Sequence, residues 1–473
     1  MTRTHWNICI AAILSLAAVL LFKPAAVSAQ EPIPDQVIVK LTPGSDIESV
    51  IFSIEGTPLD SIIGLDAFLV SFPDSMPLQL VMGRLEENPS VLGAFENHVL
   101  TFNEPYQISQ SFPDQNHPPY VSGLSPADYW DQSGSFDIGL ESASNLARGD
   151  GVTVAVIDNG LKLSHPLFDS ALTADMYDYI DGDEVPEEVE GSLYGHGTFV
   201  SGLVRLAASE CKVMPLRAFD SSGTGASFYA AMAIWDAISH GVDIINMSFG
   251  SYVSDEFLAM AVVDAHAAGI VMVAAAGNDS TDFPTYPAAY PEVLAVSAVD
   301  QAELAADWTN YGSYIDVCAP GVEVYSALPG EYEWGTWSGT SFAAPLVSGT
   351  IALVKSRNPS LTVSQAADAV RLSARDSLDW GWVPVPDPYY GYGQMDAFNA
   401  VLGWSRGDVD ESGTLNVSDL TFLVDHLFRG GEAPPTSMLQ GDVNCSGELN
   451  VSDLTVMADF LFRGEDIARP CYY

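Results

Sequence analysis

Short apolar runs alternate with helical patterns through the middle of this chain, from Gly151 onward. Such runs are typical of strands that are buried on both faces of a parallel sheet. The expected strands are Val152–Ile157, Val213–Phe219, Ile244–Met247, Val271–Ala276 and Val293–Val299, with helices at Phe228–His240 and Glu256–Ala268. Strands that alternate with helices predict an α/β unit, in which a parallel sheet carries helices on both faces.

Three residues of this unit have the side chains that a serine nucleophile requires. Asp158 ends the first apolar run, His196 stands between two glycines before a predicted helix, and Ser341 begins the helix that follows Gly339. Catalysis of this kind needs a hydroxyl to attack, an imidazole to take its proton and a carboxylate to orient the imidazole. A serine before a helix is more often an N-cap, so the interpretation depends on all three stretches together.

Six segments resemble the signature blocks of the subtilisin-like serine proteases, the subtilases, and they come in the order of that family between about Gly151 and Ala400. These segments are Val154–Gly160, Gly195–Gly202, Asp243–Gly250, Val273–Asn278, Tyr286–Val296 and Gly339–Pro345. The order Asp, His, Ser is also that of subtilisin. One departure is Asn159, which stands where the family usually has Ser or Thr.

The resemblance implies a subtilisin-like fold and a role for each residue of the site. Ser341 would be the nucleophile, His196 the general base and then acid, and Asp158 the residue that orients the imidazole. The Asn278 side chain and the Ser341 backbone N–H would donate to the oxyanion, and both Asp158 and Asn278 follow strands at the ends where open α/β sheets bind ligands.

The resemblance also implies a groove that holds a protein or peptide substrate as an added strand. Its two sides would be formed by Gly223, Thr224 and Gly225, and by Ser248, Phe249 and Gly250. The primary specificity pocket would be walled by Ala274, Ala275 and Ala276, with Thr285 near its base. Small walls of this kind favour a sizeable apolar or aromatic side chain.

The residues before the α/β unit divide into three segments. Residues 1–29 have a basic start, an apolar core and a small-residue exit, which predicts a cleaved secretory signal, with a membrane anchor as the alternative. Residues 30–103 combine alternating strand patterns with one helical pattern, and before a subtilase unit they resemble the family's α+β propeptide; a permanent accessory domain is the alternative. Residues 104–150 read as an exposed linker and the start of the mature region, and residues 151–403 as the catalytic domain.

Residues 404–473 contain a duplicated loop. Gly407–Asp419 returns 34 residues later as Gly441–Asp453. Each copy has oxygen-bearing side chains at the spacing of an EF-hand Ca²⁺ loop, with glycine at the sixth position. The expected Ca²⁺ ligands are Asp408, Asp410, Ser412, Thr414, Asn416 and Asp419, and Asp442, Asn444, Ser446, Glu448, Asn450 and Asp453.

The twelfth position of each loop is Asp rather than the Glu of EF-hands, and in this the segment resembles dockerin modules. That resemblance implies a small α-helical module that docks on a cohesin-type scaffold protein through Val417–Ser418 and Val451–Ser452. A calcium-stabilised cap on the protease is the alternative reading. Further Ca²⁺ sites in the catalytic domain are left open.

The charge balance limits the partners of this chain. It has 62 acidic and 17 basic residues, a formal net charge of −45. Such a surface repels nucleic acid and anionic lipid and attracts divalent cations.

Of the cysteines beyond the signal, Cys445 and Cys471 could pair, while Cys211 and Cys318 read as buried thiols. We therefore expect a secreted, calcium-binding serine endopeptidase; a non-catalytic scaffold component that retains the fold is the rival.

Overall fold

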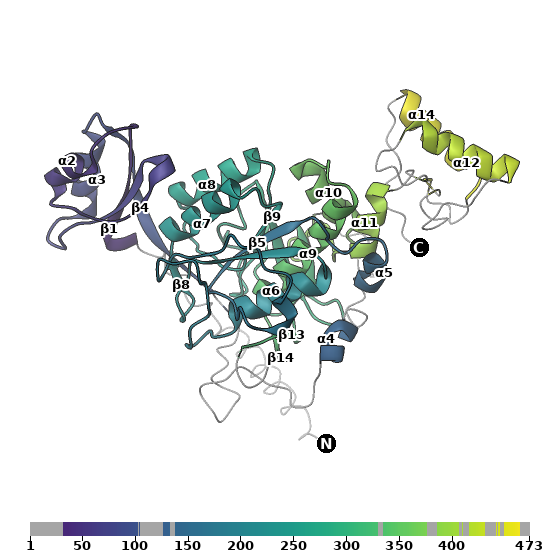
Figure 1. The fold of residues 1–473 in the computed structure, drawn as a ribbon, viewed down its shortest axis with the longest axis horizontal. Coiled ribbons are helices and arrows are strands. Elements are labelled where there is room, and N and C mark those ends of the chain that lie inside the picture. The colour runs from purple at the N-terminus through teal and green to yellow at the C-terminus, as the bar shows by residue number, and fades with distance from the viewer. Residues whose placement is uncertain are drawn as a thin grey trace, which may run out of the picture.

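The computed structural model describes residues 32–102, 104, 126–132, 138–329, 334–375, 386–405, 409, 416–430, 441, 443–444 and 449–463. Figure 1 shows three parts in chain order: an N-terminal unit, a large central unit built on a sheet, and a pair of C-terminal helices. The expected signal, most of the linker and most of the loop ligands lie outside the described residues.

The N-terminal unit is an antiparallel sheet covered by helices. Its elements are β1 (Pro32–Leu41), α2 (Ile47–Ile51), η1 (Phe52–Ile54), β2 (Thr57–Ile62), η2 (Ile63–Leu65), β3 (Ala67–Ser71), α3 (Leu78–Glu86) and β4 (Val91–Thr101). Val37, Val39 and Leu41 alternate along β1 and pack with Val81 and Leu85 of α3 in one buried cluster. The α+β prediction is confirmed, and β2 is a strand that the sequence pattern did not indicate.

The central sheet has seven parallel strands in the order β12-β11-β10-β9-β5-β7-β6. Their bounds are β5 (Thr153–Asp158), β6 (Tyr177–Asp178), β7 (Lys212–Arg217), β9 (Ile244–Met247), β10 (Val271–Ala275), β11 (Val293–Val299) and β12 (Val317–Pro320). All five predicted strands are present. The two additional strands form the edges of the sheet, and they are only two and four residues long.

Helices cover both faces of this sheet, as predicted. Val154 and Val156 of β5 join one core with α6 (His196–Ala207), α9 (Thr340–Arg357) and α10 (Val363–Ser373). The alternate residues Ala155 and Ile157 join a second core with α7 (Ser227–Ser239) and α8 (Glu256–Ala267). Because successive strand side chains point to opposite faces, an uninterrupted apolar run supplies both cores.

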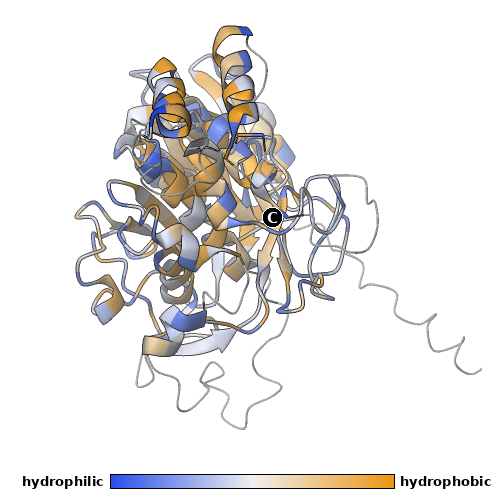
Figure 2. Cartoon of the chain, turned by 90° about the vertical axis from the view of Figure 1, so that its right-hand side faces the viewer, coloured by the Kyte–Doolittle hydropathy of each residue, from blue (hydrophilic) through white to orange (hydrophobic). Residues whose placement is uncertain are grey.

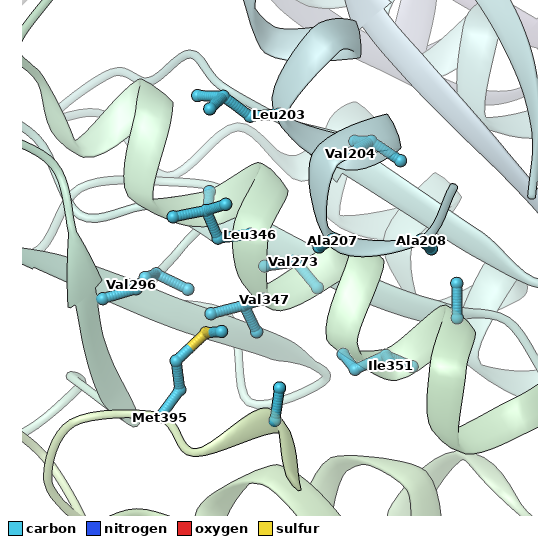
Figure 3. Packing of buried hydrophobic residues seen from close by; sticks show 14 of the residues in the cluster. Leu203, Val204, Ala207, Ala208, Val273, Val296, Leu346, Val347, Ile351 and Met395 are labelled. Carbon is cyan, nitrogen blue, oxygen red and sulfur yellow. The ribbon is translucent and has the colours of Figure 1, made fainter. Parts of the chain in front are cut away.

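Helices α6 and α9, which carry His196 and Ser341 at their first turns, pack directly on each other. Figure 3 shows Leu203 and Val204 of α6 near Leu346, Val347 and Ile351 of α9, with strand residues behind them. A β-carbon on Gly349 of α9 would lie 2.5 Å from Ala207 Cβ, so glycine permits this close approach. The packing fixes the two helix N-termini relative to each other.

Residues beyond the sheet complete the central unit. They include one 3₁₀ helix, three α-helices, one further strand and a hairpin of two strands. These elements are η5 (Pro166–Phe168), α4 (Pro126–Asp131), α5 (Leu140–Ser144), α11 (Ala397–Ser405), β8 (Thr224–Ala226), and β13 (Val324–Ala327) with β14 (Trp334–Trp337). Tyr129 and Ile138 are fully buried in the core of α6 and α9. Composition predicts an exposed linker here, but these described residues of the segment pack into the central unit.

The C-terminal helices α12 (Val417–Arg429) and α14 (Val451–Arg463) pack as a matched pair. Their small core contains Leu423 with Met457 and Val409 with Val443, and the residues of each pair are 34 positions apart in the sequence.

In Figure 2 the helices of the molecule carry hydrophilic and hydrophobic bands side by side, whereas the central strands are mainly hydrophobic. Within the described residues, no helix has the length and hydropathy to cross a membrane.

Candidate active site

Asp158 and His196 meet at the carboxyl end of the central sheet. Asp158 is the last residue of β5 and His196 the first residue of α6, and the side chains of both are buried. His196 Nδ1 lies 2.8 Å from Asp158 Oδ1, which also accepts a hydrogen bond from Asn159 N at 2.8 Å. A carboxylate in this position fixes the tautomer of the imidazole and stabilises its protonated form.

Two neighbouring side chains hold the first turn of α6. Asn159 Oδ1 accepts a hydrogen bond from Gly197 N at 3.0 Å, and its Nδ2 donates to Leu193 O at 2.9 Å. Glu188 Oε1 accepts from Gly197 N at 2.9 Å, and Glu188 Oε2 accepts from the Thr198 hydroxyl at 2.6 Å. These contacts satisfy backbone N–H groups that a helix N-terminus otherwise leaves unpaired. Asn159, the departure from the family pattern, therefore positions the helix that carries His196.

Glu188 is buried close to the Asp158–His196 pair. Burial raises the pKa of Glu188 to about 8, and the charge of Asp158 adds to this, while the hydrogen bonds from Thr198 oppose it. Nothing in the local sequence of Glu188 distinguishes it from the acidic residues around it, so this position cannot be predicted from the sequence.

Ser341 lies in the first turn of α9 and is buried. Its hydroxyl donates to Ser248 O at 3.2 Å, and its carbonyl accepts from Ser248 Oγ at 2.8 Å. The adjacent Phe342 ring packs against the His196 ring with centroids 5.4 Å apart. The residue that follows Ser341 thus contacts His196 from a different helix, while the serine hydroxyl itself is bonded to Ser248 O.

Asn278 lies next to the same turn. Its Oδ1 accepts hydrogen bonds from Thr340 N and from Thr340 Oγ1, both at 2.9 Å. Because Asn278 Oδ1 is fixed on Thr340, the NH₂ group of the amide is directed away from Thr340. An amide oriented in this way, next to the serine N–H, is suited to donate to an oxyanion.

The last residues of the N-terminal unit run through the predicted groove as an antiparallel strand. Val99, Leu100 and Thr101 of β4 pair with Ala226, Gly225 and Thr224 of β8. On the other side, Thr101 exchanges hydrogen bonds of 3.1 and 3.0 Å with Gly250, and Phe102 N donates to Gly223 O at 3.2 Å. The two predicted sides of the groove therefore flank this segment, which is held as an extended peptide substrate would be.

Phe102 and Glu104 both contact His196. The Phe102 ring stacks on the imidazole with a centroid separation of 4.2 Å and an interplanar angle of 10°. Glu104 Oε1 lies 3.0 Å from His196 Nε2, while its Oε2 is buried and makes no hydrogen bond to a described residue. Burial lowers the pKa of His196, but Asp158 and Glu104 outweigh it and raise the pKa to about 10. Both ring nitrogens of His196 thus lie within hydrogen-bond distance of a carboxyl oxygen.

The predicted pocket residues are buried, and Asn310 links two of them, since its Nδ2 also donates to Ala276 O at 3.1 Å. Ala274 and Ala275 are buried in β10, and Ala276 follows them, also buried. Thr285 is buried and accepts a hydrogen bond from Asn310 Nδ2 at 3.1 Å. A β-carbon on Gly250 would lie 2.5 Å from Thr285 Cγ2, so the glycine is needed where the groove passes this residue. Phe249 is buried in the core beneath.

Five of the twelve predicted Ca²⁺ ligands are among the described residues, two from the first loop and three from the second. Asp419 and Asp453 are fully buried, and each accepts a hydrogen bond from a loop backbone N–H, Asn416 N at 2.8 Å and Asn450 N at 2.9 Å. A buried carboxylate is costly unless it is hydrogen-bonded or paired with a cation. The five described residues carry the oxygen-bearing side chains that Ca²⁺ prefers. Across the described residues, no group of three or more His, Cys, Asp and Glu is arranged to hold a metal ion.

The other described loop ligands are the asparagines. Asn416 Oδ1 accepts from Ser418 N at 2.8 Å, and Asn450 Oδ1 accepts from Ser452 N at 2.9 Å, so each side chain caps its helix. Asn444 N donates to Asp453 Oδ1 at 3.1 Å. The remaining predicted ligands lie outside the described residues, namely Asp408, Asp410, Ser412, Thr414, Asp442, Ser446 and Glu448.

Comparison with known families decides the assignment of the central unit. The sequence profile described as the subtilase family matches residues 149–393, more than half of the chain. The chain belongs to the subtilase family. A second profile, described as the fervidolysin N-terminal prodomain, matches residues 22–97. This subtilase is therefore a serine protease with a fervidolysin-like prodomain.

Individual relatives agree with this family. Thermitase of Thermoactinomyces vulgaris is 31% identical over 280 residues, which cover 57% of this chain and 95% of thermitase. Subtilisin of Bacillus pumilus is 37% identical over 235 residues, which cover 48% of this chain and 84% of that protein. The crystal structure of fervidolysin from Fervidobacterium pennivorans, described as a keratinolytic enzyme related to subtilisin, superposes with a TM-score of 0.66 at 23% identity. That match covers 79% of this subtilase and 61% of the fervidolysin chain.

Proposed function

We propose that this subtilase is an endopeptidase in which Ser341, His196 and Asp158 form the catalytic triad. In this mechanism, His196 Nε2 takes the proton of the Ser341 hydroxyl as the oxygen attacks the scissile carbonyl, and Asp158 stabilises the imidazolium. Asn278 and the Ser341 N–H donate to the oxyanion. The imidazolium then gives its proton to the leaving amine, and water hydrolyses the acyl-enzyme.

The observation that carries the proposal is the extended segment that runs between β8 and Gly250 and ends against His196. A groove that binds backbone through Gly223 and Gly250 accepts many sequences, as an endopeptidase requires. The aromatic side chain of Phe102, stacked on His196, indicates that the neighbouring subsite accepts aromatic residues. The small residues of Ala274–Ala276 support a preference for large apolar side chains in the primary pocket.

The test is hydrolysis of a denatured protein such as casein by the purified mature form. We expect wild type to release peptides and Ser341→Ala to release none above the buffer rate. A folded wild-type mature form that cleaves neither casein nor short aromatic peptides would favour the rival, a binding or scaffold component that retains the fold.

We also propose that residues 404–473 form a dockerin-like module that binds two Ca²⁺ ions. The fully buried Asp419 and Asp453 at matching positions support this. Calcium titration of the full chain by calorimetry should show about two sites for the two loops. Asp453→Ala should remove one of them and leave the other, and an unchanged titration would contradict the assignment.

The partner that we propose for this module is a cohesin-type scaffold protein. Val417 and Val451 are exposed, 53% and 55%, at equivalent places on the two helices. Ser418 and Ser452 beside them are exposed as well. Binding of the full chain to an immobilised cohesin domain in Ca²⁺, and its loss in EDTA, would support docking. If no cohesin binds while Ca²⁺ raises the melting temperature, the module is a stabilising cap.

We propose that the protein is secreted, because residues 1–29 have the composition of a cleaved signal. The proposed boundaries remain a propeptide at 30–103, the start of the mature region at 104–150, the catalytic domain at 151–403 and the module at 404–473. N-terminal sequencing of the protein from culture medium tests the signal and its removal together.

A further inference from the structure

The loop that carries Asn278 is bound by the side chain of a second asparagine, Asn310. This residue lies between β11 and β12 and is fully buried. Its Oδ1 accepts hydrogen bonds from Asp279 N at 2.9 Å and from Thr281 N at 3.3 Å. Its Nδ2 donates to Ala276 O at 3.1 Å. The Asn310 side chain therefore bonds to the backbone on both sides of Asn278.

The partners of Asn310 fix the orientation of its amide. A backbone N–H can only donate and a backbone carbonyl can only accept, so the amide oxygen must face Asp279 and Thr281. The NH₂ group must then face Ala276 O, and it also donates to Thr285 Oγ1 at 3.1 Å. A flipped amide would lose all of these hydrogen bonds. One side chain thus joins the loop of Asn278 to the base of the predicted primary pocket.

Gly277, the residue before Asn278, shows how closely Asn310 approaches the loop. Asn310 N donates to Gly277 O at 2.9 Å, and Gly277 has a φ of +102°. A β-carbon on Gly277 would collide with Asn310 Nδ2. Gly277 N donates to Thr340 Oγ1 at 3.1 Å, and the same hydroxyl donates to Asn278 Oδ1. The loop is therefore held between Asn310 and the turn that begins α9.

We propose that Asn310 is a positioning residue of the oxyanion site, because its amide fixes the loop on both sides of Asn278. The inference rests on the proposed protease function and on the role proposed there for Asn278. A donor to an oxyanion contributes most when it is fixed before the reaction begins. Thr340 fixes the Asn278 amide itself, but the amide keeps its place only if the backbone that carries it is also fixed. Asn310 thus acts on the reaction through Asn278.

Removal of the Asn310 amide should loosen the loop without unfolding it. Backbone hydrogen bonds join residues 277–281 with residues 308–311, and they do not involve the Asn310 side chain. In Asn310→Ala these bonds remain, while Asp279 N and Thr281 N lose their acceptor. The loop then has more than one arrangement, and Asn278 occupies the productive one for less of the time.

The test is a double-mutant cycle on kcat, measured with a chromogenic peptide on the mature form produced from the full chain. Asn310→Ala should lower kcat roughly 10- to 100-fold and change KM less than about threefold. In the Asn278→Ala background the same substitution should lower kcat less than about threefold further, because the donor that Asn310 positions is already gone. A residue that only stabilises the fold would change kcat by the same factor in both backgrounds.

A matched control removes another asparagine amide from the central unit. Asn399 lies in α11, and its Nδ2 donates to Asp396 Oδ2 at 3.1 Å. Asn399→Ala should lower the melting temperature without a change in kcat. Asn310→Ser is the smaller change at the proposed position, and it should lower kcat in the same direction. It enters the cycle if Asn310→Ala does not fold.

Wild-type kcat in both Asn310 variants would overturn the inference, and so would equal kcat losses with and without Asn278. A change confined to KM would also overturn it, because Asn310 would then act in substrate binding alone. In each of these cases wild type still hydrolyses the peptide and Ser341→Ala does not. If the protease function itself is wrong, neither wild type nor any variant hydrolyses the peptide. The two failures are thus distinguishable.

Discussion

At the scale of single residues, the site is built from hydrogen bonds that orient groups before any substrate binds. The Asn278 amide is held by two donors from Thr340, and the His196 ring is held by Asp158. Groups fixed in this way need no reorganisation when charge develops, which is the main electrostatic contribution to catalysis.

Asn278→Ala should therefore lower kcat far more than it changes KM, because the amide acts on the oxyanion of the transition state. We expect a loss of ~10²–10³ in kcat, a magnitude taken from subtilisin itself. Steady-state kinetics of the mature form on a chromogenic peptide measures it. A loss below about threefold, or a change confined to KM, would remove Asn278 from the proposed oxyanion site.

Glu188 predicts a pH dependence of stability. Its folded pKa is raised from 4.5 to about 8, so its protonated form stabilises the fold below pH 4.5, and this contribution is lost as the pH rises to about 8. Glu188→Gln keeps the shape of the side chain without its charge. Between pH 4.5 and pH 8 the unfolding free energy of wild type should fall by on the order of a few kcal/mol more than that of Glu188→Gln. Denaturant unfolding in the Ser341→Ala background, which prevents self-digestion, makes the comparison. Parallel curves for the two proteins would contradict the assignment.

At the scale of elements, the close approach of α6 and α9 sets the distance between His196 and Ser341. In an unhindered helix, Gly→Ala is stabilising by about 1 kcal/mol. At Gly349 the added methyl would lie 2.5 Å from Ala207 Cβ and 2.8 Å from Val204 O, and overpacking of this kind costs about 1–3 kcal/mol. Gly349→Ala should therefore destabilise the protein.

Gly83 in α3 provides the matched control, because a β-carbon there meets nothing within 4 Å. Gly83→Ala should stabilise the N-terminal unit or leave it unchanged, while Gly349→Ala lowers the melting temperature of the central unit. Thermal unfolding of both variants in the Ser341→Ala background tests the sign. Stabilisation by Gly349→Ala would show that α6 and α9 are not in close contact.

The sequence predicts elements where burial leaves a clear pattern. Strands β9 and β11 begin and end where the apolar runs predict, because both faces of these strands are buried. Strand β12 contains Cys318 and Pro320 in only four residues, so its pattern is too short to recognise. Asp158 and Asn278 could be predicted from their motifs. The contact of Glu104 with His196 joins residues 92 positions apart and depends on how two units dock, which no local pattern encodes.

At the scale of the whole molecule, the N-terminal unit completes structural features of the catalytic unit. Helix α7 begins after Ala226, which has no capping side chain, and Asn97 Oδ1 accepts from Phe228 N at 3.1 Å in its place. His98 Nδ1 lies 2.7 Å from Asp255 Oδ2, the N-cap of α8. A prodomain that supplies these partners stabilises the folded catalytic unit and covers its groove at the same time.

The His98 contact should make this association depend on pH. Burial lowers the pKa of His98, but Asp255 and Glu96 outweigh it, so the pKa lies above the usual 6.5. Protonated His98 therefore stabilises the uncut chain below pH 6.5, and this contribution is lost as the pH rises through its folded pKa. In the Ser341→Ala background, His98→Gln should lower the melting temperature more at pH 6 than at pH 9. An equal effect at both pH values would contradict an ionic role for His98.

The central claim is that Ser341, His196 and Asp158 act together on a bound peptide carbonyl. The most direct measurement is to treat the mature protein with a fluorophosphonate and to map the adduct by peptide mass spectrometry. We predict one adduct, on Ser341, with labelling abolished in Ser341→Ala and strongly reduced in His196→Ala. A folded mature protein that remains unlabelled, or that is labelled at another residue, would contradict the account.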